Sequence, residues 1–236
     1  KLRSSFGKDE GKAIQVHATF SAYVELTEYS KGINMSRCGR VIMAEAKRHM
    51  VANVADMKSP TFNLMESIVK ELQKAHDSKT AYVKCRFAYP SWTKVYASKL
   101  DTVEYVDVIW EAIADGDDVT ELLTVENVGI SLCPCSKEMS LILNNLNSYE
   151  KEVWRNVRST LTDDPSAHEL IKKIERAGFG AHNQRSHVAV TVQLIPGQQV
   201  WFEDLISITD KSFSAPIRAI LKREDEKVEG ELAYLG

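Results

Sequence analysis

The order of hydrophobic patterns along the first half of the chain most constrains its fold. Residues 13–26 are rich in β-branched and aromatic side chains with partial alternation, which is typical of a strand with one buried face. Helical patterns follow at residues 35–50 and after Pro60, which suits the first turn of a helix. Residues 81–89 and 96–110 return to β alternation. This β-α-α-β-β order predicts a mixed fold of strands and helices.

The second half repeats the theme of strands and helices around a polar segment. Residues 119–132 and 186–195 have strand patterns, whereas residues 200–210 and 215–222 favour helices. The stretch from 142 to 176 is polar and helix-prone, which indicates an insertion. Because no low-complexity linker separates the halves, we expect a single compact unit with two related modules.

Composition excludes several classes of protein. The chain has 236 residues, 44% of them hydrophobic, and a formal net charge of −3, as in an ordinary globular protein without a basic field for nucleic acid. No stretch approaches the ~20 apolar residues of a membrane span, and the first residues lack the apolar core of a secretory signal. We therefore expect a cytoplasmic protein with four reduced cysteines, which are Cys38, Cys85, Cys133 and Cys135.

Two of these cysteines lie two residues apart where the predicted strand 119–132 ends. A loop at the end of a strand presents side chains beyond the sheet, and a thiolate is a strong ligand for zinc-like ions. Pro134 stiffens the backbone between Cys133 and Cys135, so only one sulfur need face a site. The spacing is not the C-x-x-C of a zinc ribbon. Two buried apolar cysteines explain this segment equally well.

A second polar cluster, residues 181–186, stands between a glycine-containing turn and a strand. His182 can bind a metal or transfer protons, Gln184 can bind a purine edge, and the guanidinium of Arg185 suits phosphate. The alternative is a solvated turn. A third cluster, residues 222–227, contains carboxylates that could join a Cys and His metal site, although a solvated helix end explains its spacing better.

Together these segments resemble the type IB GTP cyclohydrolase family. Residues 31–37 (KGINMSR) resemble the family's K-G-x-H-M-S-R, SLCPCSKEMS resembles its C-P-C-S-K-E-I-S, and GAHNQRS is shared. Further on, residues 201–206 and 221–227 resemble W-x-E-D-L-I and L-K-R-x-D-E-K. The resemblance implies an α+β tunnelling fold (T-fold), with modules at residues 1–112 and 113–236.

By the same resemblance, the chain would convert GTP to 7,8-dihydroneopterin triphosphate and formate with a divalent ion, Zn²⁺, Mn²⁺ or Fe²⁺. Cys133 and His182 would be catalytic and would bind the ion together with Glu226, and Cys135 would be a secondary sulfur. Candidates for binding the substrate are Lys137, Arg185, Arg37 and Gln184. The family further implies a homotetramer with sites at subunit interfaces, and no nucleic-acid or membrane partner.

The sequence departs from the family pattern in three places. Asn34 replaces the histidine before Met-Ser-Arg, residues 141–179 form an insertion between the two main motifs, and the chain ends at Gly236 before the family's F-V-E-D and E-S-I-H motifs. Either more sequence follows, another polypeptide supplies these motifs, or the site is incomplete. Two other functions therefore stay open, a non-catalytic T-fold protein that binds purine nucleotides or only assembles, and a pterin or deazapurine enzyme with Cys133 as nucleophile.

Overall fold

The fold is known from a computed structural model. It describes residues 2–3, 13–14, 16–26, 28–29, 32–52, 63–95, 97–133, 135, 182–196, 200–226 and 228. The helices are α1 (Met35–Ala52), α2 (Leu64–His76) and α6 (Phe202–Asp210). The strands are β1 (Leu2–Arg3), β2 (Ala13–Ile14), β3 (Ala18–Val24), β4 (Thr80–Lys94), β5 (Asp101–Asp115), β6 (Asp118–Leu132), β7 (Asn183–Leu194) and β8 (Ala215–Pro216).

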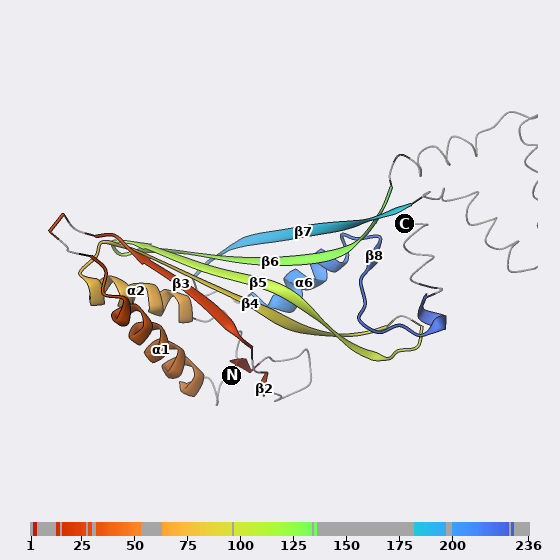
Figure 1. The fold of residues 1–236 in the computed structure, drawn as a ribbon, viewed down its shortest axis with the longest axis horizontal. Coiled ribbons are helices and arrows are strands. Elements are labelled where there is room, and N and C mark those ends of the chain that lie inside the picture. The colour runs from red at the N-terminus through yellow and green to blue at the C-terminus, as the bar shows by residue number, and fades with distance from the viewer. Residues whose placement is uncertain are drawn as a thin grey trace, which may run out of the picture. The chain divides into compact units, whose positions relative to one another are not determined.

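The main sheet is six-stranded, with the order β3-β4-β5-β6-β7 and with β8 paired to β6 (Figure 1). The pairs β3–β4, β5–β6 and β6–β8 are antiparallel. β1 and β2 form a separate two-stranded antiparallel sheet. An antiparallel sheet accompanied by a few helices confirms the α+β class. None of the helices in the described ranges is long and apolar enough to cross a membrane.

Most of the expected elements are confirmed. The predicted helices appear as α1, α2 and α6, and the strand patterns that flank the two main motifs appear as β6 and β7. The helix predicted at residues 215–222 is wrong. Ala215 and Pro216 instead pair with Ile130 and Gly129 of β6, so hydrogen bonds to the sheet replace those of a helix. The predicted insertion at 141–179 lies outside the described residues.

The described residues group into two compact units. Unit 1 comprises Lys1–Trp92, Val103–Asn127 and Val188–Thr209, and unit 2 comprises Thr93–Thr102, Val128–His187 and Asp210–Gly236. Each unit is formed by segments that are distant in the sequence. The modules expected at residues 1–112 and 113–236 stay a prediction.

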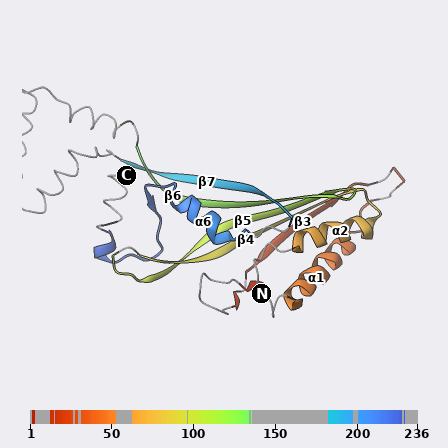
Figure 2. The ribbon, with the colours of Figure 1, turned by 180° about the vertical axis from the view of Figure 1, so that it is seen from behind.

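The core of unit 1 lies between one face of the sheet and helices α2 and α6. Four α2 side chains with the spacing i, i+3, i+4 and i+7 are completely buried, as expected for one apolar face of a helix. They are Met65, Ile68, Val69 and Leu72. They belong to one cluster with Phe202 of α6 and with alternate residues of β4, β5 and β6, so both helices cover the same sheet face. Figures 1 and 2 show α1 beside α2.

The opposite sheet face of unit 1 carries charged side chains in place of a core. Arg86 of β4 donates to Asp107 at 2.9 Å and to Glu126 at 3.4 Å, and Asp107 pairs in register with Glu126. The same alternation that buries one side chain exposes the next. Ile109 and Ile113 of β5 lie on the same face as Asp107, so this face mixes charged and apolar side chains. The large buried cluster of the unit lies on the helical side.

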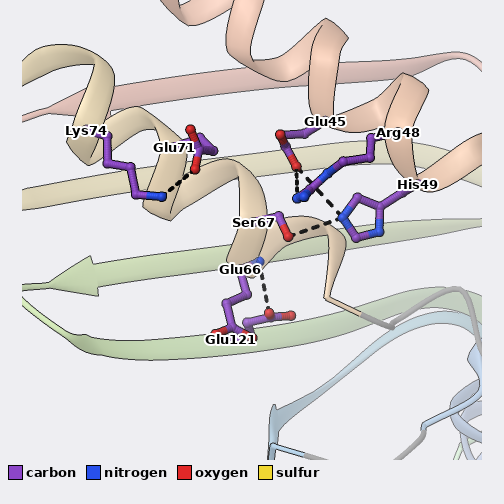
Figure 3. A network of polar contacts seen from close by, with 8 residues as sticks. All are labelled: Glu45, Arg48, His49, Glu66, Ser67, Glu71, Lys74 and Glu121. Atoms are coloured by element: carbon purple, nitrogen blue, oxygen red, sulfur yellow. Dashed lines mark hydrogen bonds and ion pairs between the residues drawn. The ribbon is translucent and has the colours of Figure 1, made fainter. Parts of the chain in front are cut away.

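A half-buried carboxylate joins the start of α2 to the sheet. Glu121 of β6 accepts the Glu66 backbone N–H at 3.0 Å (Figure 3). It also accepts the Trp110 indole N–H at 3.0 Å. Burial raises the pKa of Glu121, and these two donors act in the opposite direction. The first N–H groups of a helix lack partners within the helix, so Glu121 supplies an acceptor that α2 needs.

We expect Glu121→Leu to lower the free energy of unfolding by roughly 2–4 kcal/mol, because it leaves the Glu66 backbone N–H and the indole N–H of the buried Trp110 without this acceptor. Urea denaturation of both proteins measures the difference. The matched control is Glu126→Leu, the same substitution in the same strand. It removes only an ion pair with the half-exposed Arg86, and should cost less than about 1 kcal/mol. Equal losses in the two variants would contradict this role of Glu121.

One further polar contact in Figure 3 joins α1 to α2, and the others lie within a single helix. His49 of α1 lies 3.1 Å from the Ser67 hydroxyl of α2, and the buried Glu45 carboxylate accepts a hydrogen bond from Arg48. Burial lowers the pKa of His49, and the neighbouring Arg48 charge lowers it further. His49 therefore stays mostly neutral at pH 7 and serves in the α1–α2 contact.

Candidate active site

The sheet brings the two main sequence motifs together in unit 2. Cys133 directly follows β6, His182 directly precedes β7, and these strands are neighbours in the sheet. The backbone N–H of Cys133 donates to the carbonyl oxygen of His182 at 3.2 Å. The Cys133 side chain is buried, whereas His182 is exposed. A thiol and an imidazole are thus placed on adjoining backbone segments.

The backbone that leads to Cys133 is also held by the segment around β8. The Ser214 N–H donates to the Ile130 carbonyl at 3.0 Å, and the Leu132 N–H donates to the Ser214 hydroxyl at 3.1 Å. β8 continues this contact by pairing with β6. Hydrogen bonds to Ser214 and the pairing with β8 therefore hold the residues before Cys133, and a backbone hydrogen bond links Cys133 itself to His182.

This contact requires a glycine at position 129. The ring of Phe213 lies against Gly129 so closely that an added Cβ would come within 3.0 Å of the ring atoms, a distance that real Cβ atoms do not show. Both residues are buried in unit 2. Because Gly129 has no side chain, the Phe213–Ser214 turn can approach the end of β6 this closely.

The predicted substrate-binding residues are placed as follows. Gln184 and Arg185 are exposed on β7, in the two positions after Asn183. Arg37 belongs to unit 1, where its guanidinium donates to the Ala75 carbonyl at the end of α2 at 3.1 Å. Lys137 lies outside the described residues. Gln184 and Arg185 are thus near His182 in the chain, whereas Arg37 has a structural contact between helices.

Asn34, which replaces a family histidine, belongs to the start of α1. Its carbonyl accepts the Arg37 N–H at 3.0 Å, and its side-chain oxygen accepts the Ser36 hydroxyl at 2.7 Å. Asparagine is favoured at such a helix start because a short polar side chain can bond locally to the first turn. The residue therefore has a local structural role.

Glu226 is exposed in a short helical turn at residues 223–226, and the preceding residue anchors that turn. The Asp225 carboxylate is completely buried and accepts the N–H groups of Ala97, Ser98 and Lys222 at 3.1, 2.7 and 3.0 Å. Although burial by itself raises the pKa of a carboxyl, these hydrogen bonds lower the pKa of Asp225 to about 2. Asp225 is therefore ionised at neutral pH.

The side chains fit a divalent ion by their chemistry. Thiolate, imidazole and carboxylate are the donors that zinc prefers, and they are supplied by Cys133, His182 and Glu226. Within the described ranges, however, no three His, Cys, Asp or Glu side chains form a group that could hold a metal. The structure brings Cys133 next to His182 at the backbone and does not add Glu226 to them. Cys135, which the family resemblance suggested as a second sulfur of the site, is exposed.

Sequence reasoning missed three residues that shape this region. Phe213 and Ser214 lie between the two helices predicted at residues 200–210 and 215–222, and Asp225 is one of several charges in a run. No sequence signal indicates the contact between Phe213 and Gly129. The single available signal for Asp225 is its place at a helical turn, where carboxylates commonly accept backbone N–H groups.

Comparisons with known proteins decide the family. The sequence pattern described as type I GTP cyclohydrolase FolE2 matches residues 2–235. The chain belongs to that family. This membership confirms the resemblance to GTP cyclohydrolases that the motifs indicated, and it covers both compact units.

The individual relatives are distant from this chain in sequence and longer than it. GTP cyclohydrolase FolE2 of Magnetococcus marinus is 28% identical over 217 residues, which cover 92% of this chain and 63% of the relative. GTP cyclohydrolase FolE2 of Thermotoga petrophila is 28% identical over 227 residues, 96% of this chain and 67% of the relative. GTP cyclohydrolase MptA of Halobacterium salinarum is 29% identical over 224 residues, which cover 93% of this chain and 66% of the relative. The chain spans about half to two thirds of the length of the curated relatives it matches.

Proposed function

We propose that this protein acts as a type IB GTP cyclohydrolase, which opens the imidazole ring of GTP and releases formate, leaving 7,8-dihydroneopterin triphosphate. Membership of the FolE2 family supports the reaction. The observation that carries the proposal is the 3.2 Å hydrogen bond between Cys133 and His182, since it joins the two motifs on which the chemistry depends.

Cys133, His182 and Glu226 would hold a divalent ion, Zn²⁺, Mn²⁺ or Fe²⁺. Such an ion, when bound, supplies the Lewis acidity that makes water a nucleophile near neutral pH. The exposed His182 imidazole would accept and return protons as the guanine ring opens at C8, because an imidazole carries both a proton-accepting and a proton-donating nitrogen. The buried Cys133 would hold its position through the fixed backbone of β6.

Gln184 and Arg185 would bind the substrate from β7. Both are exposed within three residues of His182, which suits contact with a ligand that reaches the imidazole. The amide of Gln184 can pair with the purine edge, and the guanidinium of Arg185 can bind phosphate oxygens in a bidentate manner. Lys137 and Arg37 remain candidates for the triphosphate by their charge and their place in the family motifs.

The assembly is part of the same proposal. The antiparallel sheet with helices on one face suits a T-fold, for which we expect a homotetramer with sites at subunit interfaces. The four free thiols suit a reducing compartment, so we place the enzyme in the cytoplasm.

The test is formate release from GTP by the full-length protein loaded with Zn²⁺, Mn²⁺ or Fe²⁺. We expect formate and a fluorescent pterin in equal amounts, and neither after treatment with a chelator. A metal-loaded protein that yields neither product would contradict the proposal. If that protein still binds GTP, the non-catalytic alternative replaces it.

A further inference from the structure

The two strands that lead to Cys133 and His182 are paired in a single register. The Cys133 N–H donates to the His182 carbonyl at 3.2 Å, and further along the same strands the hydroxyls of Thr124 and Thr191 lie 2.8 Å apart. Thr124 precedes Cys133 by as many positions as Thr191 follows His182. Equal steps in opposite directions mean that β6 and β7 run antiparallel, without an extra residue in either strand between the two contacts. Each residue of β6 in this stretch therefore has one opposite residue in β7.

Ser131 shares one face of β6 with Cys133. The carbonyl before Ser131 and the N–H after it both bond to Ser214, whereas the Cys133 N–H bonds on the other side of the strand to His182. Backbone groups that alternate in this way belong to a regular strand, in which side chains two positions apart share a face. Ser131 and Cys133 therefore point to the same side of the sheet.

Two side chains from the neighbouring strand meet them on that side. In the register of β6 and β7, His182 lies opposite Cys133, and Gln184 lies opposite Ser131. Directly opposed residues of an antiparallel pair have their Cβ atoms about 4.5–5.5 Å apart and point to the same face. A thiol, an imidazole, a hydroxyl and an amide are thus brought together, two from each strand.

The hydroxyl of Ser131 and the amide of Gln184 are available to a ligand. Ser131 is half-buried and Gln184 is exposed. Neither side chain has a hydrogen bond to another of the residues that the structure describes. A half-buried hydroxyl is more stable with a hydrogen-bond partner than without one, and a bound ligand can supply that partner.

The chemistry of this pair suits a neutral heterocycle better than a phosphate. A hydroxyl and a primary amide each donate and accept hydrogen bonds, and neither carries a charge. The edge of a guanine base likewise presents both donors and acceptors, whereas phosphate presents acceptors and pairs best with cations. Arg185 alternates to the other face of β7. It can still meet a bound triphosphate, because β7 is the outermost strand of the described sheet.

We propose that Ser131 contacts the guanine base of the substrate together with Gln184, on the same face as Cys133 and His182. The inference rests on the proposed function, in which GTP is the substrate. It does not depend on which side chains hold a metal, because it follows from the pairing of β6 with β7 and from the neutral groups on that face.

The test compares two variants of the full-length protein that have side chains of the same shape. Ser131→Thr keeps the hydroxyl and Ser131→Val replaces it with a methyl group, and both residues suit a strand. Isothermal titration calorimetry with GTP measures the affinity. We expect Ser131→Val to bind GTP about five- to tenfold more weakly than Ser131→Thr, which corresponds to the loss of one hydrogen bond.

Competition by UTP separates a contact to the base from a general weakening of the site. UTP shares the ribose and the triphosphate but has a different base, so its affinity should be the same in Ser131→Thr and Ser131→Val. The matched control is Asn183→Ala. Asn183 is an exposed neighbour of Gln184 on the other face of β7, so its loss should change the GTP affinity by less than about twofold.

The possible results separate the inference from the proposed function. Equal GTP affinity in Ser131→Thr and Ser131→Val, or an equal loss for GTP and UTP, overturns the contact between Ser131 and the base and leaves the proposed function standing. A loss in Asn183→Ala as large as that in Ser131→Val overturns the assignment of the face. If Ser131→Val does not fold, Ser131→Ala is compared with the wild type in its place. A wild-type protein that neither binds GTP nor releases formate overturns the proposed function, and the inference with it.

Discussion

Replacing Cys133 by alanine is expected to weaken zinc binding by at least about 100-fold and to abolish formate release at ordinary zinc concentrations. Zinc sites of four ligands bind with about 10–16 kcal/mol, so one ligand accounts for roughly 3 kcal/mol, or about two orders of magnitude. Chelator competition measures the affinity, and the formate assay measures turnover. The fold should persist, because Cys133 lies at the end of β6 rather than within the core of unit 1.

The matched control is Cys85→Ala, which removes another buried thiol. Burial raises the pKa of Cys85 to about 12, so this thiol stays protonated at neutral pH and is a poor ligand. Its loss should reduce stability through packing and leave zinc affinity unchanged.

Thiol labelling of the wild type, together with zinc binding by Cys133→Ala, distinguishes a ligand role of Cys133 from a nucleophile role. A nucleophilic Cys133 predicts that iodoacetamide labels the metal-free and metal-loaded wild type equally, and that Cys133→Ala keeps its zinc. Protection of Cys133 by zinc, together with loss of zinc in the variant, would exclude that alternative.

Replacing Gly129 by alanine is expected to cost roughly 2–4 kcal/mol of unfolding free energy. The new methyl group would overlap the buried Phe213 ring at its attachment to the chain, where the ring cannot swing away as the end of a long side chain can. Relief requires a shift of β6 or of the Phe213–Ser214 turn, which bond to each other before Cys133. Urea denaturation measures the loss, and zinc affinity should fall with it.

The control is the same substitution at Gly39, inside α1. Nothing lies within 4 Å of a Cβ at that position, so Gly39→Ala should stabilise the protein by about 0.5–1 kcal/mol through better helix propensity. A double variant with Phe213→Ala provides a further check. Its cost should be clearly less than the sum of the single costs, because removing the ring removes the overlap. Additive costs would contradict the proposed contact.

The elements of the fold could be predicted because local pattern determines them. The apolar spacing of α2 and the alternation of β6 follow from the geometry of a helix and of a strand, so each is visible within a short window of residues. The helix prediction at residues 215–222 was wrong because it, too, relied on local pattern alone. There the pairing of Ala215 and Pro216 with β6 overrode a helical pattern, and a window along the chain contains no information about such a partner.

The sequence by itself determined the chemistry that is available, namely a thiol at 133, an imidazole at 182, carboxylates at 225 and 226, and the motifs that identify the family. Only the tertiary structure decided which of these groups meet. The pairing of β6 with β7 places Cys133 beside His182, and the fold buries Asp225 against Ala97 and Ser98. The physical reason is that burial and hydrogen bonding depend on segments far apart in the chain, whereas the identity of a side chain does not.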